Sequence, residues 1–122
     1  MNKYSLALIF ILLISCNLRD KIAEMEKMDE EIQSFFNHDD IVIAINWGTE
    51  EEHNNVQVTF YQYDVTNREY SELKSTANKV TTRLISNYPK FKKLNYIETR
   101  FTEEENNDDN SSFVTFKHTD LE

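Results

Sequence analysis

Cys16 is the only cysteine of the 122-residue chain, and the residues before it bear on the fate of its thiol. Lys3 gives the start of the chain a positive charge, and nine consecutive apolar residues, 6–14, follow it. The small residue Ser15 then separates this apolar run from the cysteine. A charged start, an apolar middle and a small-residue end are typical of a secretory signal peptide. Because a membrane-spanning helix needs about 20 apolar residues, the run predicts export rather than a span.

The segment Leu13-Ile14-Ser15-Cys16 resembles the lipobox of bacterial lipoproteins, in which an apolar residue, a tolerant position and a small residue precede the cysteine. The resemblance covers residues 1–16 alone. It implies cleavage between Ser15 and Cys16, a diacylglycerol on the Cys16 thiol and often an acyl chain on the new amino group. Two or three such chains hold a protein stably on a bilayer. A short uncleaved signal anchor with an incidental cysteine is the alternative.

The residue after the cysteine bears on the membrane that would hold the protein. In many such lipoproteins an aspartate at this position retains the protein at the inner membrane, and here the residue is Asn17. The resemblance therefore favours the outer membrane of the cell envelope. It leaves open whether the domain faces the periplasm or the exterior.

Cleavage before Cys16 would leave 107 residues, enough for one small domain, 21–122, after a short linker over residues 16–20. The removed piece carries Lys3 and no acid, so 12 basic and 22 acidic side chains remain, a formal net charge of −10. Such a surface repels nucleic acid and anionic lipid headgroups, and we expect neither to be a partner. A protein or peptide is the expected partner, besides the bilayer that holds the acylated cysteine.

Other residues that could do chemistry are too dispersed to predict a reaction. The three histidines, His38, His53 and His118, have no spacing that pairs two imidazoles on one helix face. No serine lies in a Gly-x-Ser-x-Gly elbow, and with 22 acids carboxylate pairs arise by chance. Acidic runs at 50–52 and 103–110 could offer oxygen ligands to calcium, but a solvated loop explains them as well. We expect no enzyme, no metal site and no cofactor.

Apolar periodicity predicts the elements that must carry any site. Steps of three and four residues predict helices over 20–36 and 66–88, the second begun by a capping box from Thr66 to Glu69 and stopped by Pro89. Alternation predicts strands over 41–47, 56–64, 94–101 and 113–118. The order helix–strand–strand thus occurs twice, and short matches such as Val58-Thr59-Phe60 with Val114-Thr115-Phe116 favour an internal pseudo-repeat.

Two such units can bury both helices by joining their hairpins. We therefore expect an α+β fold: a four-stranded antiparallel sheet with both helices on one face. The predicted inward residues are Ile43, Ile45, Trp47, Val56, Val58, Phe60, Ile97, Phe101, Val114 and Phe116. The opposite face should stay open to water and carry Asn46, Gln57, Thr59, Tyr61, Tyr63, Thr115 and Lys117.

Exposed aromatic side chains on an open sheet face provide contact area at a small entropic cost. Tyr61 and Tyr63 are therefore the candidate binding residues, although tyrosines that simply cover the sheet would look the same. The sequence favours a non-enzymatic binding module tethered at Cys16. The alternatives are an accessory or inhibitory subunit whose acidic loops engage a basic partner, and an enzyme of an unrecognised class.

Overall fold

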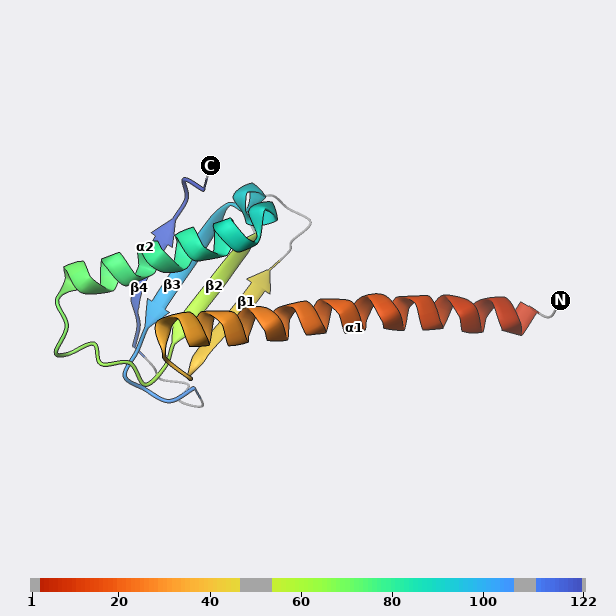
Figure 1. Ribbon diagram of the computed structural model, residues 1–122, viewed down its shortest axis with the longest axis horizontal. Coiled ribbons are helices and arrows are strands. Elements are labelled where there is room, and N and C mark those ends of the chain that lie inside the picture. The colour runs from red at the N-terminus through yellow and green to blue at the C-terminus, as the bar shows by residue number, and fades with distance from the viewer. Residues whose placement is uncertain (1–2, 47–53, 107–111, 122) are drawn as a thin grey trace.

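A computed structural model describes residues 3–46, 54–106 and 112–121, with the backbone alone for residues 3–18 and 21. The elements follow in the order α1 (Lys3–Phe36), β1 (Ile41–Asn46), β2 (Asn55–Phe60), α2 (Tyr70–Asn87), the 3-10 helix η2 (Pro89–Lys93), β3 (Tyr96–Phe101) and β4 (Val114–His118). Helix–strand–strand therefore occurs twice, and the predicted α+β class is confirmed (Figure 1).

The four strands form one mixed sheet in the order β1-β2-β3-β4. The outer pairs β1·β2 and β3·β4 are antiparallel, whereas the central pair β2·β3 is parallel, with Val56 beside Ile97. The prediction of an entirely antiparallel sheet is therefore wrong at its centre. The cause is the connection: α2 runs back along the sheet, so β3 starts at the end where β2 started, and such helical crossovers join parallel strands (Figure 1).

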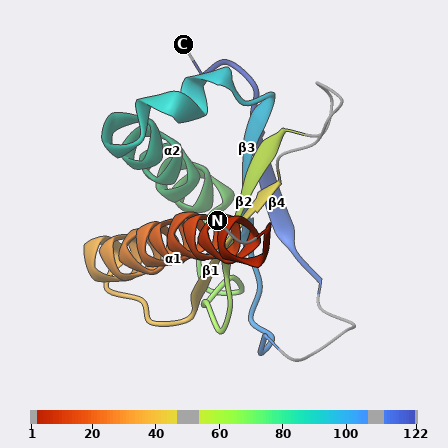
Figure 2. The ribbon, with the colours of Figure 1, turned by 90° about the vertical axis from the view of Figure 1, so that its right-hand side faces the viewer.

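Both helices cover the same face of the sheet, as predicted, and no described element covers the other face (Figure 2). The strand residues that are buried beneath the helices are Ile41, Ile43, Val56, Val58, Phe60, Ile97, Phe101 and Phe116, with Ile45 and Val114 partly buried. The helices contribute Met28, Ile32, Leu73, Ala77, Val80 and Leu84 to the same core. The predicted inward residue Trp47 lies outside the described residues.

Helix α1 begins much earlier than expected. We predicted a linker over residues 16–20 and a helix from residue 20, but the backbone is helical from Lys3 onward. No glycine or proline interrupts residues 3–36, so nothing in this stretch terminates the helix. Met28 and Ile32 are buried against the sheet, whereas Ile22 and Met25 are 49% and 39% exposed. The helix therefore leaves the domain before Met28 and projects from it (Figure 1).

The start of α2 also corrects a prediction. The helix begins at Tyr70, and neither Thr66 nor Glu69 caps it with a side-chain hydrogen bond. The Thr66 hydroxyl instead donates to Glu103 Oε1 at 2.6 Å, which is a tertiary contact that competes with capping. The predicted end is confirmed, because α2 stops at Asn87 and Pro89 opens the separate turn η2.

Phe60 lies at the centre of the aromatic core, and its ring lies 4.9 Å from that of Phe101 and 5.5 Å from that of Phe36. We predict that Phe60→Ala lowers the free energy of unfolding by about 3–5 kcal/mol, because it leaves a cavity in a close-packed interior. The matched control is Phe35→Ala, since Phe35 is 48% exposed and packs under the guanidinium of Arg83. That change should cost about 1 kcal/mol in urea unfolding. Equal losses in the two variants would contradict this account of the core.

Candidate functional site

The predicted lipidation and cleavage residues lie on the projecting part of α1. Ser15 and Cys16 belong to its helical backbone, well outside the segment that Met28 and Ile32 bury against the sheet. Their side chains are outside the described part of the structure. Within the described residues, no helix combines the length and the apolar character that crossing a bilayer requires.

The open face of the sheet carries Tyr61 beside an ordered pair of side chains. The guanidinium carbon of Arg100 lies 4.1 Å from the centroid of the Phe113 ring, and the Tyr61 ring meets Phe113 edge-on at 6.3 Å. Arg100 Nε and Nη2 both donate to Thr59 Oγ1, at 3.1 and 3.0 Å. Because hydrogen bonds from β2 hold the guanidinium, its planar face stays fixed over the ring.

A second ordered group lies on the same face, further along the strands. Lys117 Nζ is 4.1 Å from the centroid of the Tyr96 ring, and Gln57 Nε2 donates to Glu98 Oε1 at 3.1 Å. The register explains this grouping, since Gln57, Glu98 and Lys117 lie side by side across β2, β3 and β4. The open face therefore alternates aromatic rings with positive charges, on a protein whose net charge is negative.

Tyr63 does not belong to this face, which corrects the prediction. Gln62 has a left-handed backbone, φ 50°, and this interrupts the alternation that would have kept Tyr63 beside Tyr61. The Tyr63 ring packs instead against Phe60 and Phe101, at centroid distances of 5.4 and 5.1 Å. The backbone amides of Gln62 and Tyr63 donate to Glu104 O and Thr102 O, which fixes the turn.

The residues that most define the face were missed in the sequence. Thr59, Gln57 and Lys117 were predicted to lie on it, whereas Arg100, Tyr96 and Phe113 were not. The alternation in β3, with Ile97, Thr99 and Phe101 buried, contained the signal for the first two. Phe113 precedes β4 and could not be assigned to a face by periodicity, because it follows an irregular connection.

Two hollows lie on the helical side of the domain. A groove of about 450 Å³ between α1 and α2 contains the ion pair of Arg83 Nε with Glu31 Oε1, at 2.7 Å. Asn87 Nδ2 donates to the same carboxylate oxygen at 2.6 Å, so this groove is closed by contacts that join the helices. The pKa of Tyr88, which lines it, is raised by burial and then by the charges of Glu31 and Glu24.

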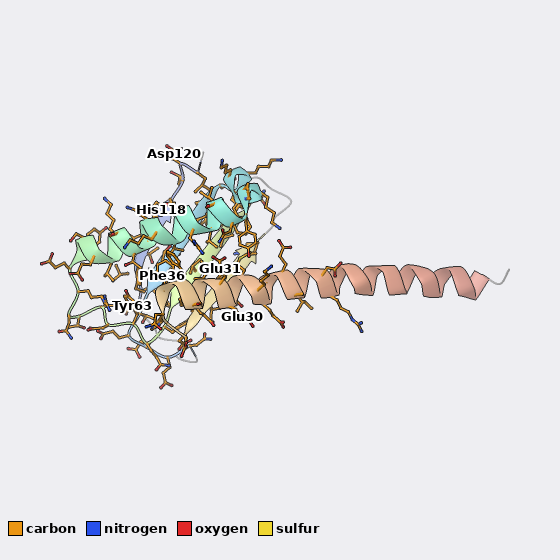
Figure 3. All side chains as sticks on the ribbon, viewed as in Figure 1. Glu30, Glu31, Phe36, Tyr63, His118 and Asp120 are labelled. Carbon is orange, nitrogen blue, oxygen red and sulfur yellow. The ribbon has the colours of Figure 1, made fainter. Side chains whose placement is uncertain are left out.

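The second hollow, about 440 Å³, is lined by residues of α2 and by the chain after β4, including His118 and Asp120 (Figure 3). His118 Nε2 lies 2.5 Å from Asn78 Oδ1, so this nitrogen carries the proton and donates. Its Nδ1 then accepts from the Thr81 hydroxyl at 3.2 Å. A hydroxyl, an imidazole and an amide in line resemble a catalytic relay, but Thr81 is buried and these bonds suffice to tie β4 to α2.

The remaining candidates have structural roles where they are described. Glu103 Oε1 accepts from the amides of Val65 and Thr66 and from the Thr66 hydroxyl, which lowers the pKa of this carboxylate. His38 Nε2 lies 2.6 Å from Tyr61 O. No cluster of three or more potential metal ligands occurs among the described residues. The acidic residues 50–52 and 107–110 and His53 lie outside them, except that Glu103, Glu104 and Glu105 are described and exposed.

Comparison with known proteins adds no relative. No family model matches the chain, and no curated protein or solved structure matches it either. The functional argument therefore rests on the chain's own residues and on the geometry of the domain.

The environment of His118 predicts a pH dependence of stability. Burial, and then the charge of Lys74, lowers the pKa of His118, so the folded state binds its proton less readily than the unfolded chain. Its stabilising contribution is therefore complete above the unfolded pKa of about 6.5 and is lost as the pH falls through that value. The melting temperature should drop between about pH 7.5 and about pH 5.5, and His118→Gln should reduce that drop. An identical drop in both proteins would contradict the assignment.

Proposed function

We propose that the protein is a bacterial lipoprotein, held at the outer membrane of the cell envelope by acyl chains on Cys16, whose domain binds a protein or peptide partner without catalysing a reaction. The proposal joins two features of the molecule. One is the signal-like segment 1–16, and the other is the uncovered face of the sheet.

The anchoring part rests on the order of residues before Cys16 and is compatible with the position of that residue. Cys16 lies on the part of α1 that projects from the domain, so an acylated thiol there would reach a bilayer without disturbing the core (Figure 1). Each buried methylene contributes about 0.8 kcal/mol to membrane binding, so two or three chains suffice for a stable anchor.

The binding part rests on one observation, the ordered open face that is formed by Tyr61, Phe113, Arg100, Tyr96 and Lys117. Aromatic and arginine side chains dominate the binding energy of protein interfaces, and here they are already held in position. Val42 adds an apolar side chain, 38% exposed, in the same cross-strand row as Thr59 and Arg100. A flat face with fixed rings and charges suits another protein better than a small molecule, which needs a concave pocket.

Anchoring is tested by Cys16→Ser in a bacterial host that acylates lipoproteins. We expect the wild-type chain to fractionate with envelope membranes and the variant to be released, because the sulfur that would carry the diacylglycerol is gone. Mass spectrometry of the wild-type protein should find the first fifteen residues missing and acyl chains on Cys16. An intact Met1 with an unmodified thiol would overturn the proposal.

A second candidate function is an accessory or inhibitory subunit that engages a basic partner through acidic loops. It is favoured by the exposed acids at the end of the domain away from the projecting helix, including Asp64, Glu103, Glu104 and Glu105. Glu103 fixes the loop of Val65 and Thr66 there, so part of this acidic end is ordered. Binding of this kind would weaken with salt beyond a Debye length of about 8 Å.

Crosslinking in envelope membranes distinguishes the two surfaces. Arg100→Glu should reduce capture of a partner at least about ten-fold if the open face binds it, since it removes a fixed cation–aromatic pair. Glu104→Gln with Glu105→Gln should do so only if the acidic end binds. Lys79→Glu, an equal charge reversal on exposed α2, is the control. If no variant differs from the wild type, neither surface is the binding site.

The pseudo-repeat belongs to the same proposal as the origin of the domain. The two helix–strand–strand units each form an antiparallel hairpin, and Phe60 and Phe116 occupy inward positions on the second strand of each. This equivalence supports duplication of one ancestral unit.

A further inference from the structure

The helix η2 lies at the end of the domain from which α1 projects. Lys90 Nζ of η2 donates to Glu24 Oε1 of α1 at 3.0 Å, and Glu24 precedes the buried part of α1. Phe91, which is completely buried, fixes η2 to the core. Figure 3 shows η2 and the C-terminal end of α2 beside the segment where α1 leaves the domain.

The charges of the described domain are divided between its two ends. Helix η2 has three exposed lysines in five residues, Lys90, Lys92 and Lys93. The loops at the other end of the sheet are rich in acids: Asp39, Asp40, Asp64, Glu69, Glu103, Glu104 and Glu105, with Arg68 among them. The overall negative charge therefore hides a polarity along the domain.

Two described acids lie close to the lysines and reduce their effect. Glu24 pairs with Lys90, and Asp120 lines the same hollow as Lys92. Lys93 adds to the remaining excess of positive charge at this end, in contrast to the acidic opposite end. Residues 47–53, which include three glutamates, lie outside the described residues.

The distance from Cys16 brings this end within reach of a bilayer. Glu24 follows Cys16 by eight residues, which is about 12 Å along a helix. The headgroup layer on one side of a bilayer takes up roughly 5–7 Å of that distance. The remainder is shorter than the Debye length of about 8 Å, so the lysines would feel the headgroup charge.

We infer that the domain is oriented on the membrane, with the lysines of η2 against anionic headgroups and the acidic end directed away. This inference rests on the proposed acylation of Cys16, which delivers the domain to the bilayer. It also qualifies our expectation that anionic lipids are repelled, because that expectation averages the charge over the whole surface. Attraction at one end and repulsion at the other act in the same direction on the orientation.

The test uses the acylated protein, purified from membranes and reconstituted in vesicles of phosphatidylcholine with or without an equal amount of phosphatidylglycerol. Two exposed serines of α2 serve as label sites, Ser86→Cys near η2 and Ser71→Cys near the acidic end. They are fifteen residues apart, about 22 Å along the helix. Nitroxide-labelled headgroups should quench a fluorophore at position 86 far more than one at position 71, and more so with phosphatidylglycerol.

The lysines are tested by Lys92→Glu with Lys93→Glu in the Ser86→Cys protein. Each lysine near an anionic surface is worth about five-fold in local partitioning, so quenching at position 86 should fall at least about two-fold. Lys74→Glu with Lys79→Glu makes the same change of charge elsewhere on exposed α2 and should leave the quenching unchanged.

The outcomes separate the inference from the proposal beneath it. If the purified protein carries no acyl chain and does not associate with vesicles, the lipoprotein proposal fails. If it is acylated and bound but positions 71 and 86 are quenched equally, the inferred orientation fails while the anchor stands. Equal effects of the two lysine pairs would also overturn it, because the orientation would then not depend on η2.

Discussion

The parallel pairing of β2 with β3 is the constraint on which the arrangement of this domain depends. It joins two antiparallel hairpins into one sheet and requires the connection to return along the sheet, which α2 does. Because α2 buries Leu73, Ala77, Val80 and Leu84 on the face that α1 also covers, one face holds the whole helical layer. The second face is left without a described cover, and this is why aromatic and basic side chains remain accessible there (Figure 2).

Much of this arrangement follows from sequence periodicity, and the errors have physical causes. The strands and the stop at Pro89 were predictable, because alternation and a missing amide are local properties. The parallel pair was predictable in principle from the helix between β2 and β3, but we weighed hairpin joining more heavily. Tyr63 was misassigned because the left-handed backbone of Gln62 depends on tertiary hydrogen bonds. Thr66 failed as a cap for the same reason, since Glu103 lies far away in sequence.

The distribution of charge matters more than its sum in this molecule. Glutamates and aspartates gather in the loops at one end of the sheet, where Glu103 also organises the backbone before α2. Lysines gather on η2, where Phe91 holds them in a fixed position. The open face adds Arg100 and Lys117, each held against an aromatic ring. A formal charge therefore describes none of the three surfaces on which the proposals depend.

The two proposed surfaces are geometrically compatible. Helix α1 packs flat on the sheet, so its axis runs roughly parallel to the plane of the strands (Figures 1 and 2). If α1 leads toward the bilayer, the sheet stands upright and its open face looks sideways, along the membrane surface. A partner that is itself held at the membrane would then meet Arg100 and Phe113 by lateral diffusion. A short helical stalk restricts rotation more than a flexible linker does, so it would keep the open face in this attitude.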